Sequence, residues 1–160
     1  MTQQVSENHH RIYLASSWRN LYQPDLIIRL RAWGHEVYDF RNPQPGNSGF
    51  HWSAIDAVWE NWSVLEYRES LSNPIAEHGF KLDMDALKWS DMVVLLLPSG
   101  RSAHSEAAWH CGQGKPVIVQ RPEPCEPELM YKMYNAITED EDELFAHLNI
   151  PLSQMEALSL

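Results

Sequence analysis

The sequence has few positive charges and no run of them. Its 160 residues include 12 Lys and Arg against 22 Asp and Glu, which gives a formal net charge of −10 at pH 7. A protein that binds along a nucleic-acid backbone needs clustered basic side chains to neutralise the phosphates. We therefore expect no polymeric nucleic-acid partner. Much of the acidity lies in residues 123–128 and 138–143, so a small anionic ligand is still compatible with the middle of the chain.

Long apolar stretches and cysteines are equally scarce. The longest apolar run, residues 92–98, is far shorter than the roughly 20 residues of a membrane-spanning helix. The first residues lack the apolar core of a signal peptide, and the two cysteines, Cys111 and Cys125, lie apart in the sequence. These features predict a cytoplasmic protein with free thiols and no membrane partner.

The length is that of a single ordinary domain, and no repeat or low-complexity segment divides it. We expect a flexible N-terminus over residues 1–10, one folded domain over residues 11–150 and a C-terminal tail over residues 151–160.

Strand and helix patterns alternate along the chain. Strands are predicted over residues 11–15, 35–40, 91–98, 115–120 and, briefly, 135–137; helices are predicted over residues 26–33, 54–71, 73–90, 103–113 and 128–134, with a last helix ending at Leu148 after a capping-box pattern at Thr138 and Glu141. The run at 91–98 is apolar at consecutive positions, as in a strand buried on both faces. The alternation predicts an α/β fold, a single-domain open parallel sheet of about five strands with helices on both faces, flavodoxin-like or Rossmann-like.

Polar segments follow the first strand and the strand at 91–98. In such sheets ligands bind at the carboxyl ends of the strands, where the strand order reverses, so we expect the site there. Glu106 lies just inside the predicted start of the helix that follows the second of these strands. The helix dipole stabilises a carboxylate at such a position, so the position alone does not require a function.

Three stretches of the chain resemble the nucleoside 2-deoxyribosyltransferase family and its relatives that hydrolyse the N-glycosidic bond of nucleotides. They are "IYLASSW" at 12–18, "LDMDALKWSDMVVLLLP" at 82–98 and "SEAAWHCGQGKPVIV" at 105–119. The resemblance implies that Glu106 is the nucleophile, that Asp83 contacts the base and helps it leave, and that Tyr13 positions Glu106. Asp83 as a solvated helix residue and Tyr13 as a core aromatic are the alternative interpretations.

The loop before Glu106 departs from the family pattern. Gly100 stands where nucleoside-acting members have an acidic residue that contacts the 5′-hydroxyl, and Ser102 and His104 stand where glycines are common. Hydroxyls, backbone N–H groups and Arg101 at a helix N-terminus suit a phosphate, which favours a 5′-monophosphate substrate. A solvent-facing charge is the alternative for Arg101. The predicted substrate-binding residues are Ser16, Ser17, Trp18, Arg19, Asp39, Phe50, Trp52, Ser99, Gly100, Arg101, Ser102 and His104.

Residues 41–53 are predicted to form a long loop, because they hold two Pro, two Gly and two Asn without periodicity. Phe50 and Trp52 in this loop either stack on a base or attach the loop to the core.

We expect no metal and no cofactor, since the histidines lack partners at ligand spacing. The resemblance implies a homodimer or larger homo-oligomer in which residues 127–137 of a neighbour close the pocket, with Tyr131, Tyr134 or Asn135 reaching across. Three other functions stay open. They are a non-catalytic nucleotide-binding sensor, a phosphoribohydrolase of the Pro-Gly-Gly-x-Gly-Thr-x-x-Glu type, and an interaction domain with a Trp-rich surface.

Overall fold

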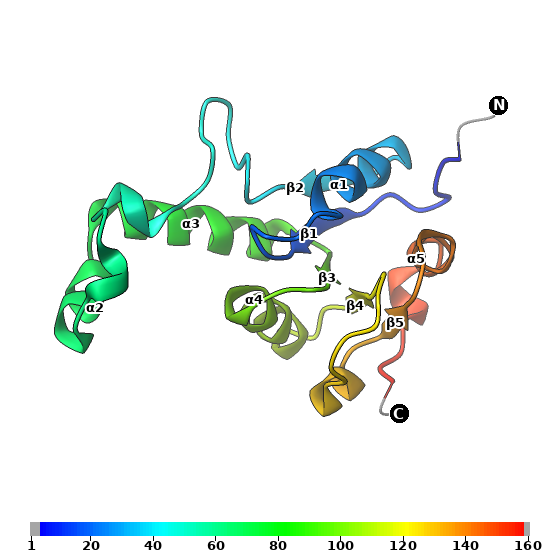
Figure 1. Cartoon of the computed structure of the whole chain (residues 1–160). Helices are drawn as coiled ribbons and strands as arrows, with labels where there is room; N and C mark the ends of the chain where they lie inside the picture. The colour runs from blue at the N-terminus through cyan, green and yellow to red at the C-terminus, as the bar shows by residue number, and fades with distance from the viewer. Residues whose placement is uncertain (1–3, 159–160) are drawn as a thin grey trace. The chain divides into compact units, whose positions relative to one another are not determined.

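The structure, a computed structural model, describes residues 4–158 and divides into two compact units (Figure 1). One unit consists of residues 4–38 and 89–158, and the other of residues 39–88. The segments expected at 1–10 and 151–160 lie partly outside the described residues. Within residues 4–158, no helix has the length and apolar character needed to cross a membrane.

The first unit contains a parallel sheet of five strands within the described residues. The strands are β1 (Arg11–Ala15), β2 (Glu36–Tyr38), β3 (Met92–Leu96), β4 (Val117–Gln120) and β5 (Ala136–Thr138). Their order is β2-β1-β3-β4-β5, and every neighbouring pair is parallel. This is the flavodoxin-like order, in which the strand order reverses between β1 and β3. The predicted fold class is therefore confirmed.

Helices cover both faces of this sheet (Figure 1). Helix α1 (Gln23–Ala32) packs beside β2 and α5 (Glu141–Leu148) beside β5, whereas α4 (Arg101–Gly112) packs on β1, β3 and β4. The core under α1 and α5 is formed by apolar side chains of the helices and of alternate strand positions: Ile12, Leu14, Leu26, Ile27, Leu30, Trp33, Val37, Met92, Val94, Leu96, Ile118, Ala136, Leu144 and Leu148. Gly34 follows α1 at φ +102°, the left-handed conformation that glycine commonly adopts after a helix.

The remaining strand positions point to the other face, because successive side chains of a strand alternate. Tyr13 and Ala15 of β1 and Val93 and Leu95 of β3 are all fully buried there. This face of the sheet is the one on which α4 packs.

The second unit contains two short 3₁₀ turns, η1 (Trp52–Ala54) and η2 (Trp59–Asn61), the helix α2 (Val64–Ser70) and most of α3 (Pro74–Trp89). The helix predicted over 73–90 is confirmed, whereas a continuous helix over 54–71 is wrong. Asp56 explains the break, because its carboxylate accepts hydrogen bonds from the Val58 N–H at 3.0 Å and from the Trp62 indole at 2.8 Å. Ser63 and Glu66 then start α2 with a capping box.

Several helix predictions are corrected. Helix α1 begins at Gln23, three residues before the predicted start. Helix α4 begins at Arg101, two residues before the predicted start. Residues 129–133 form a 3₁₀ helix, η3 (Leu129–Met133). The N-cap of α5 is Asp140, which accepts the Glu143 N–H at 2.9 Å, because Thr138 is buried in β5 and its hydroxyl bonds the Val119 carbonyl.

Candidate functional site

The polar segments after β1 and β3 lie side by side, as expected. Ser16 donates its hydroxyl to the Leu96 carbonyl at 3.0 Å, and the Asn20 amide donates to the Pro98 carbonyl at 3.0 Å. The Asn20 side-chain oxygen also accepts the Gln23 N–H at 3.0 Å at the start of α1. Asn20 therefore joins both loops at the point where the strand order reverses.

Glu106 lies in the second turn of α4, because the helix begins at Arg101 with Gly100 as its N-cap. The influence of the helix dipole fades beyond the first turn. The dipole therefore stabilises the Glu106 carboxylate less than it would if the helix began at the predicted residue 103. Ala103, Ala107 and His110 form the buried stripe of α4. Glu106 is half-buried at the edge of this stripe, three residues after Ala103 and four before His110.

Tyr13 lies in the middle of β1, opposite Val93 of β3 and Tyr38 of β2 in the sheet register. Its ring is fully buried and stacks on the Tyr38 ring at a centroid distance of 5.1 Å. Alternation along β1 directs Tyr13 to the face on which α4 packs. The structure therefore brings Tyr13 and the helix of Glu106 to the same face of the sheet.

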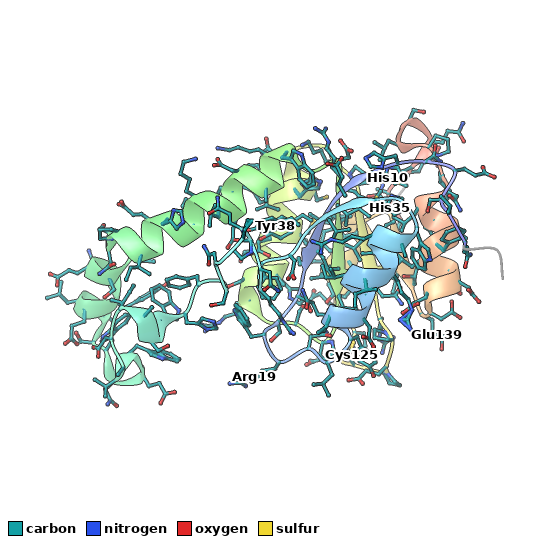
Figure 2. All side chains as sticks on the ribbon, turned by 90° about the horizontal axis from the view of Figure 1, so that it is seen from above. His10, Arg19, His35, Tyr38, Cys125 and Glu139 are labelled. Carbon is teal, nitrogen blue, oxygen red and sulfur yellow. The ribbon has the colours of Figure 1, made fainter. Side chains whose placement is uncertain are left out.

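The loop that enters α4 is open and positively charged. Gly100, Arg101 and Ser102 are exposed, and no side chain caps the first turn of the helix. Within residues 4–158, neither Arg101 nor Arg19 forms an ion pair. Figure 2 shows Arg19 at the end of the unit opposite His10 and His35. Free guanidinium groups and uncapped N–H groups at a helix start are suited to an anion.

His104, in the same loop-to-helix region, uses both ring nitrogens within the chain. Its Nδ1 is 2.8 Å from the Gly100 carbonyl, so Nδ1 carries the proton and donates. Its Nε2 then accepts the Tyr131 hydroxyl at 2.7 Å. The Tyr131 ring stacks on His104 and on Tyr134. Burial raises the pKa of the Tyr131 phenol, which keeps it a donor.

Four predicted site residues, Asp39, Phe50, Trp52 and Asp83, belong to the unit of residues 39–88. Asp83 is half-buried on α3. Asp39 is nearly buried and accepts hydrogen bonds from the Arg41 N–H and the Asn42 amide, both at 3.0 Å. The Asp39 carboxylate thus shapes the turn after β2.

Phe50 and Trp52 form part of an aromatic cluster within the same unit. Their rings lie 4.7 Å apart, and Trp52 also packs edge-on against Trp62 and Tyr67. The Phe50 side chain lies so close to Gly79 that a Cβ added there would be 3.0 Å from the Phe50 Cβ and 3.2 Å from its ring. These are the contacts of a loop attached to its own core, which is one of the two interpretations; base stacking stays a prediction.

Two contacts at the site, those of Asn20 and Tyr131, were not predicted from the sequence. Asn20 follows a strand and precedes a helix, the usual place of a capping residue, so its role could have been predicted. Tyr131 bonds His104 of its own chain, and contact of Tyr131, Tyr134 or Asn135 with a neighbouring copy stays a prediction. Tyr134 is likewise buried, and the Asn135 side chain accepts the Val117 N–H at 2.9 Å.

The two cysteines in the described residues are free thiols, as predicted. Cys111 is partly buried, and this burial raises the pKa of its thiol. Among residues 4–158, no three His, Cys, Asp or Glu side chains gather as a metal site requires.

Comparisons with known proteins found no matching family model and no matching curated protein. Among solved structures, the chain is similar to a 2-deoxyribosyltransferase from Bacillus psychrosaccharolyticus, with 25% sequence identity and a TM-score of 0.57. That similarity covers 91% of this chain and 98% of the transferase. A CMP N-glycosidase from Clostridium botulinum is 20% identical, with a TM-score of 0.47 and coverage of 89% and 100%. The similarity to the transferase confirms that this chain resembles the nucleoside 2-deoxyribosyltransferase family.

Proposed function

We propose that this protein cleaves or exchanges the N-glycosidic bond of a (deoxy)nucleoside or its 5′-monophosphate, with Glu106 as the nucleophile. The proposal is supported by the similarity to a known enzyme together with the position of Glu106. The chain is similar over 91% of its length to a 2-deoxyribosyltransferase, and Glu106 lies on the helix that follows β3 at the switch point of the sheet.

In the proposed reaction the Glu106 carboxylate attacks C1′ of the sugar. The C1′–N bond breaks, its electron pair leaves with the base, and a glycosyl ester forms on Glu106. The hydroxyl of Tyr13 holds the carboxylate in one orientation. The burial of Tyr13 supports this role, because a fixed partner preserves the benefit of proximity.

Asp83 is the proposed acid. It either protonates the departing base, which leaves Asp83 as a carboxylate, or assists departure through a hydrogen bond without losing its proton. In the first case the carboxylate then accepts a proton from water that hydrolyses the ester, or from a second base that takes up the sugar. Either route frees Glu106 for another cycle. The half-buried position of Asp83 on α3 is compatible with this role.

A 5′-monophosphate is the proposed substrate form. Arg101 and Ser102 are exposed at the uncapped start of α4, and Gly100 stands where an acidic residue would repel a phosphate. Arg19, Ser17 and Trp18 are further candidates in the loop after β1, which Asn20 joins to this region.

We also propose that the protein forms a homodimer or larger homo-oligomer. Helix α2 has no buried residue, and large apolar side chains of the same unit are exposed: Val58 60%, Val64 74%, Leu65 61% and Phe80 69%. Large exposed apolar patches are typical of interaction surfaces. A cytoplasmic location and the absence of a cofactor stay predictions from the sequence.

Base release by the purified protein tests the function. We expect free base from at least one member of a panel of ribo- and deoxynucleosides, each with and without a 5′-phosphate, measured by liquid chromatography. Faster release from a monophosphate than from its nucleoside supports the phosphate site, and equal rates contradict it. No release from any member would contradict the enzyme and favour a nucleotide sensor.

A further inference from the structure

We propose that Tyr131 is a positioning residue for the loop between β3 and α4, and that it acts through His104. This inference rests on the proposed function to the extent that the loop holds the phosphate of the substrate. Tyr131 lies 27 residues beyond His104 in the chain, on η3, and its side chain is 7% exposed.

The connection consists of two consecutive hydrogen bonds. The Tyr131 hydroxyl donates to His104 Nε2 at 2.7 Å, and His104 Nδ1 donates to the Gly100 carbonyl at 2.8 Å. Nδ1 also lies 3.5 Å from the Ser99 hydroxyl, but the Gly100 carbonyl is much closer and can only accept. The bonds to Gly100 and Tyr131 together therefore select one neutral tautomer of His104. The stacked rings of Tyr131 and His104 keep the imidazole in this plane.

Within residues 4–158, the hydrogen bonds to the Gly100 carbonyl come from His104. Gly100 is exposed, and a Cβ added there would meet no atom within 4 Å. Its carbonyl receives the His104 backbone N–H at 3.3 Å, a longer bond than the one from the imidazole. The side chain of His104 therefore contributes strongly to the orientation of this peptide.

The orientation of Gly100 determines where the first N–H groups of α4 point. These groups belong to residues 101–103, and no side chain caps them. A phosphate bound at this helix start would depend on the direction of these groups. Removing the Tyr131 hydroxyl leaves His104 Nε2 without its donor. The preference for one tautomer then weakens, the imidazole becomes more mobile, and the Gly100 peptide is held less firmly. His104 thus serves the proposed phosphate site by fixing the backbone.

The test compares Tyr131→Phe with Tyr134→Phe. Tyr134 is a matched control, because it is buried, stacks on Tyr131 and has no hydrogen bond with His104 in the described chain. The first readout is ¹⁵N NMR of the His104 ring and of the backbone amides of residues 100–103. We expect Tyr131→Phe to mix the His104 tautomers and shift these amides, and Tyr134→Phe to leave both as in the wild type.

The second readout is steady-state kinetics on a nucleoside 5′-monophosphate and on the matching nucleoside. We expect Tyr131→Phe to raise KM for the monophosphate about tenfold, with kcat and the KM of the nucleoside within about twofold of wild type. Unchanged ring and amide signals, or an equal loss on both substrates, would overturn the positioning role. The NMR result stands without activity, so an inactive wild type would contradict the proposed function alone.

Discussion

His35 offers a sharp prediction about stability, because it is buried and bonded as a neutral ring beside His10. His35 Nδ1 accepts the His10 backbone N–H at 3.1 Å, and Nε2 lies 2.9 Å from the Ser6 hydroxyl. The two imidazoles stack at a centroid distance of 5.2 Å, and Figure 2 shows them next to each other. Protonation of Nδ1 would break the bond to His10 and place a charge against that ring.

Burial, followed by the neighbouring His10 and His9, lowers the pKa of His35 from 6.5 to about 4. The unfolded chain therefore binds a proton between these two pH values while the folded chain does not. The stabilisation by neutral His35 is complete above pH 6.5 and is lost as the pH falls toward 4. Between pH 8 and pH 5 the linkage relation gives a loss of ~2 kcal/mol, which solvent screening reduces to ~1–2 kcal/mol.

Thermal unfolding of the wild type and of His35→Asn at pH 8 and pH 5 measures this pH-dependent loss of stability. Asn keeps an acceptor near the position of Nδ1 but does not titrate. His9 pairs with Glu36 at 2.9 Å in both proteins, so its contribution cancels in the difference. We expect the wild type to lose about 2–8 °C more in Tm than the variant on acidification. His78→Asn, at an exposed site of α3, is the control and should behave as wild type. An equal loss in wild type and His35→Asn would refute the reasoning.

Three further predictions concern the proposed function. Asp83→Asn should lower kcat about 10²–10⁴-fold, and the loss should be smaller for substrates whose base is a better leaving group. An equal loss of kcat for all leaving groups would contradict the role of Asp83 as an acid. Arg101→Gln should raise KM for a 5′-monophosphate about 10–100-fold and leave the nucleoside unchanged, and a similar change for both would place Arg101 outside a phosphate site. Light scattering should show a dimer or larger assembly that Leu65→Glu shifts toward monomer; a monomeric wild type would contradict the oligomer.

Several elements could be predicted from the sequence because a local pattern determines them. The consecutive apolar residues of β3 indicate burial on both faces, and Gly34 and Gly114 adopt the positive φ expected after a helix. The break before α2 was missed because Asp56 competes with helical hydrogen bonds, an effect that helical spacing does not reveal.

In the candidate site, too, some features could be predicted from the sequence and others could not. The resemblance implied the roles of Glu106 and Tyr13. Alternation along β1 and the packing of α4 then bring Tyr13 and the helix of Glu106 to one face of the sheet. The bond between His104 and Tyr131 joins residues that are distant in sequence, and no local pattern encodes it. Tyr131 and Asn135 are bonded within their own chain. Contact of the segment at 127–137 with a neighbouring copy, which the resemblance implies, stays a prediction.

Loss of base release on Glu106→Gln tests the central claim most directly. The substitution keeps the size and polarity of the side chain and removes the charge that attacks C1′. Glu77→Gln, at an exposed site in the first turn of α3, is the matched control. With a substrate that the wild type cleaves, we predict base release at the wild-type rate by Glu77→Gln and no detectable release by Glu106→Gln, with unchanged circular dichroism. Base release by Glu106→Gln at the wild-type rate would contradict the assignment of Glu106 as the nucleophile.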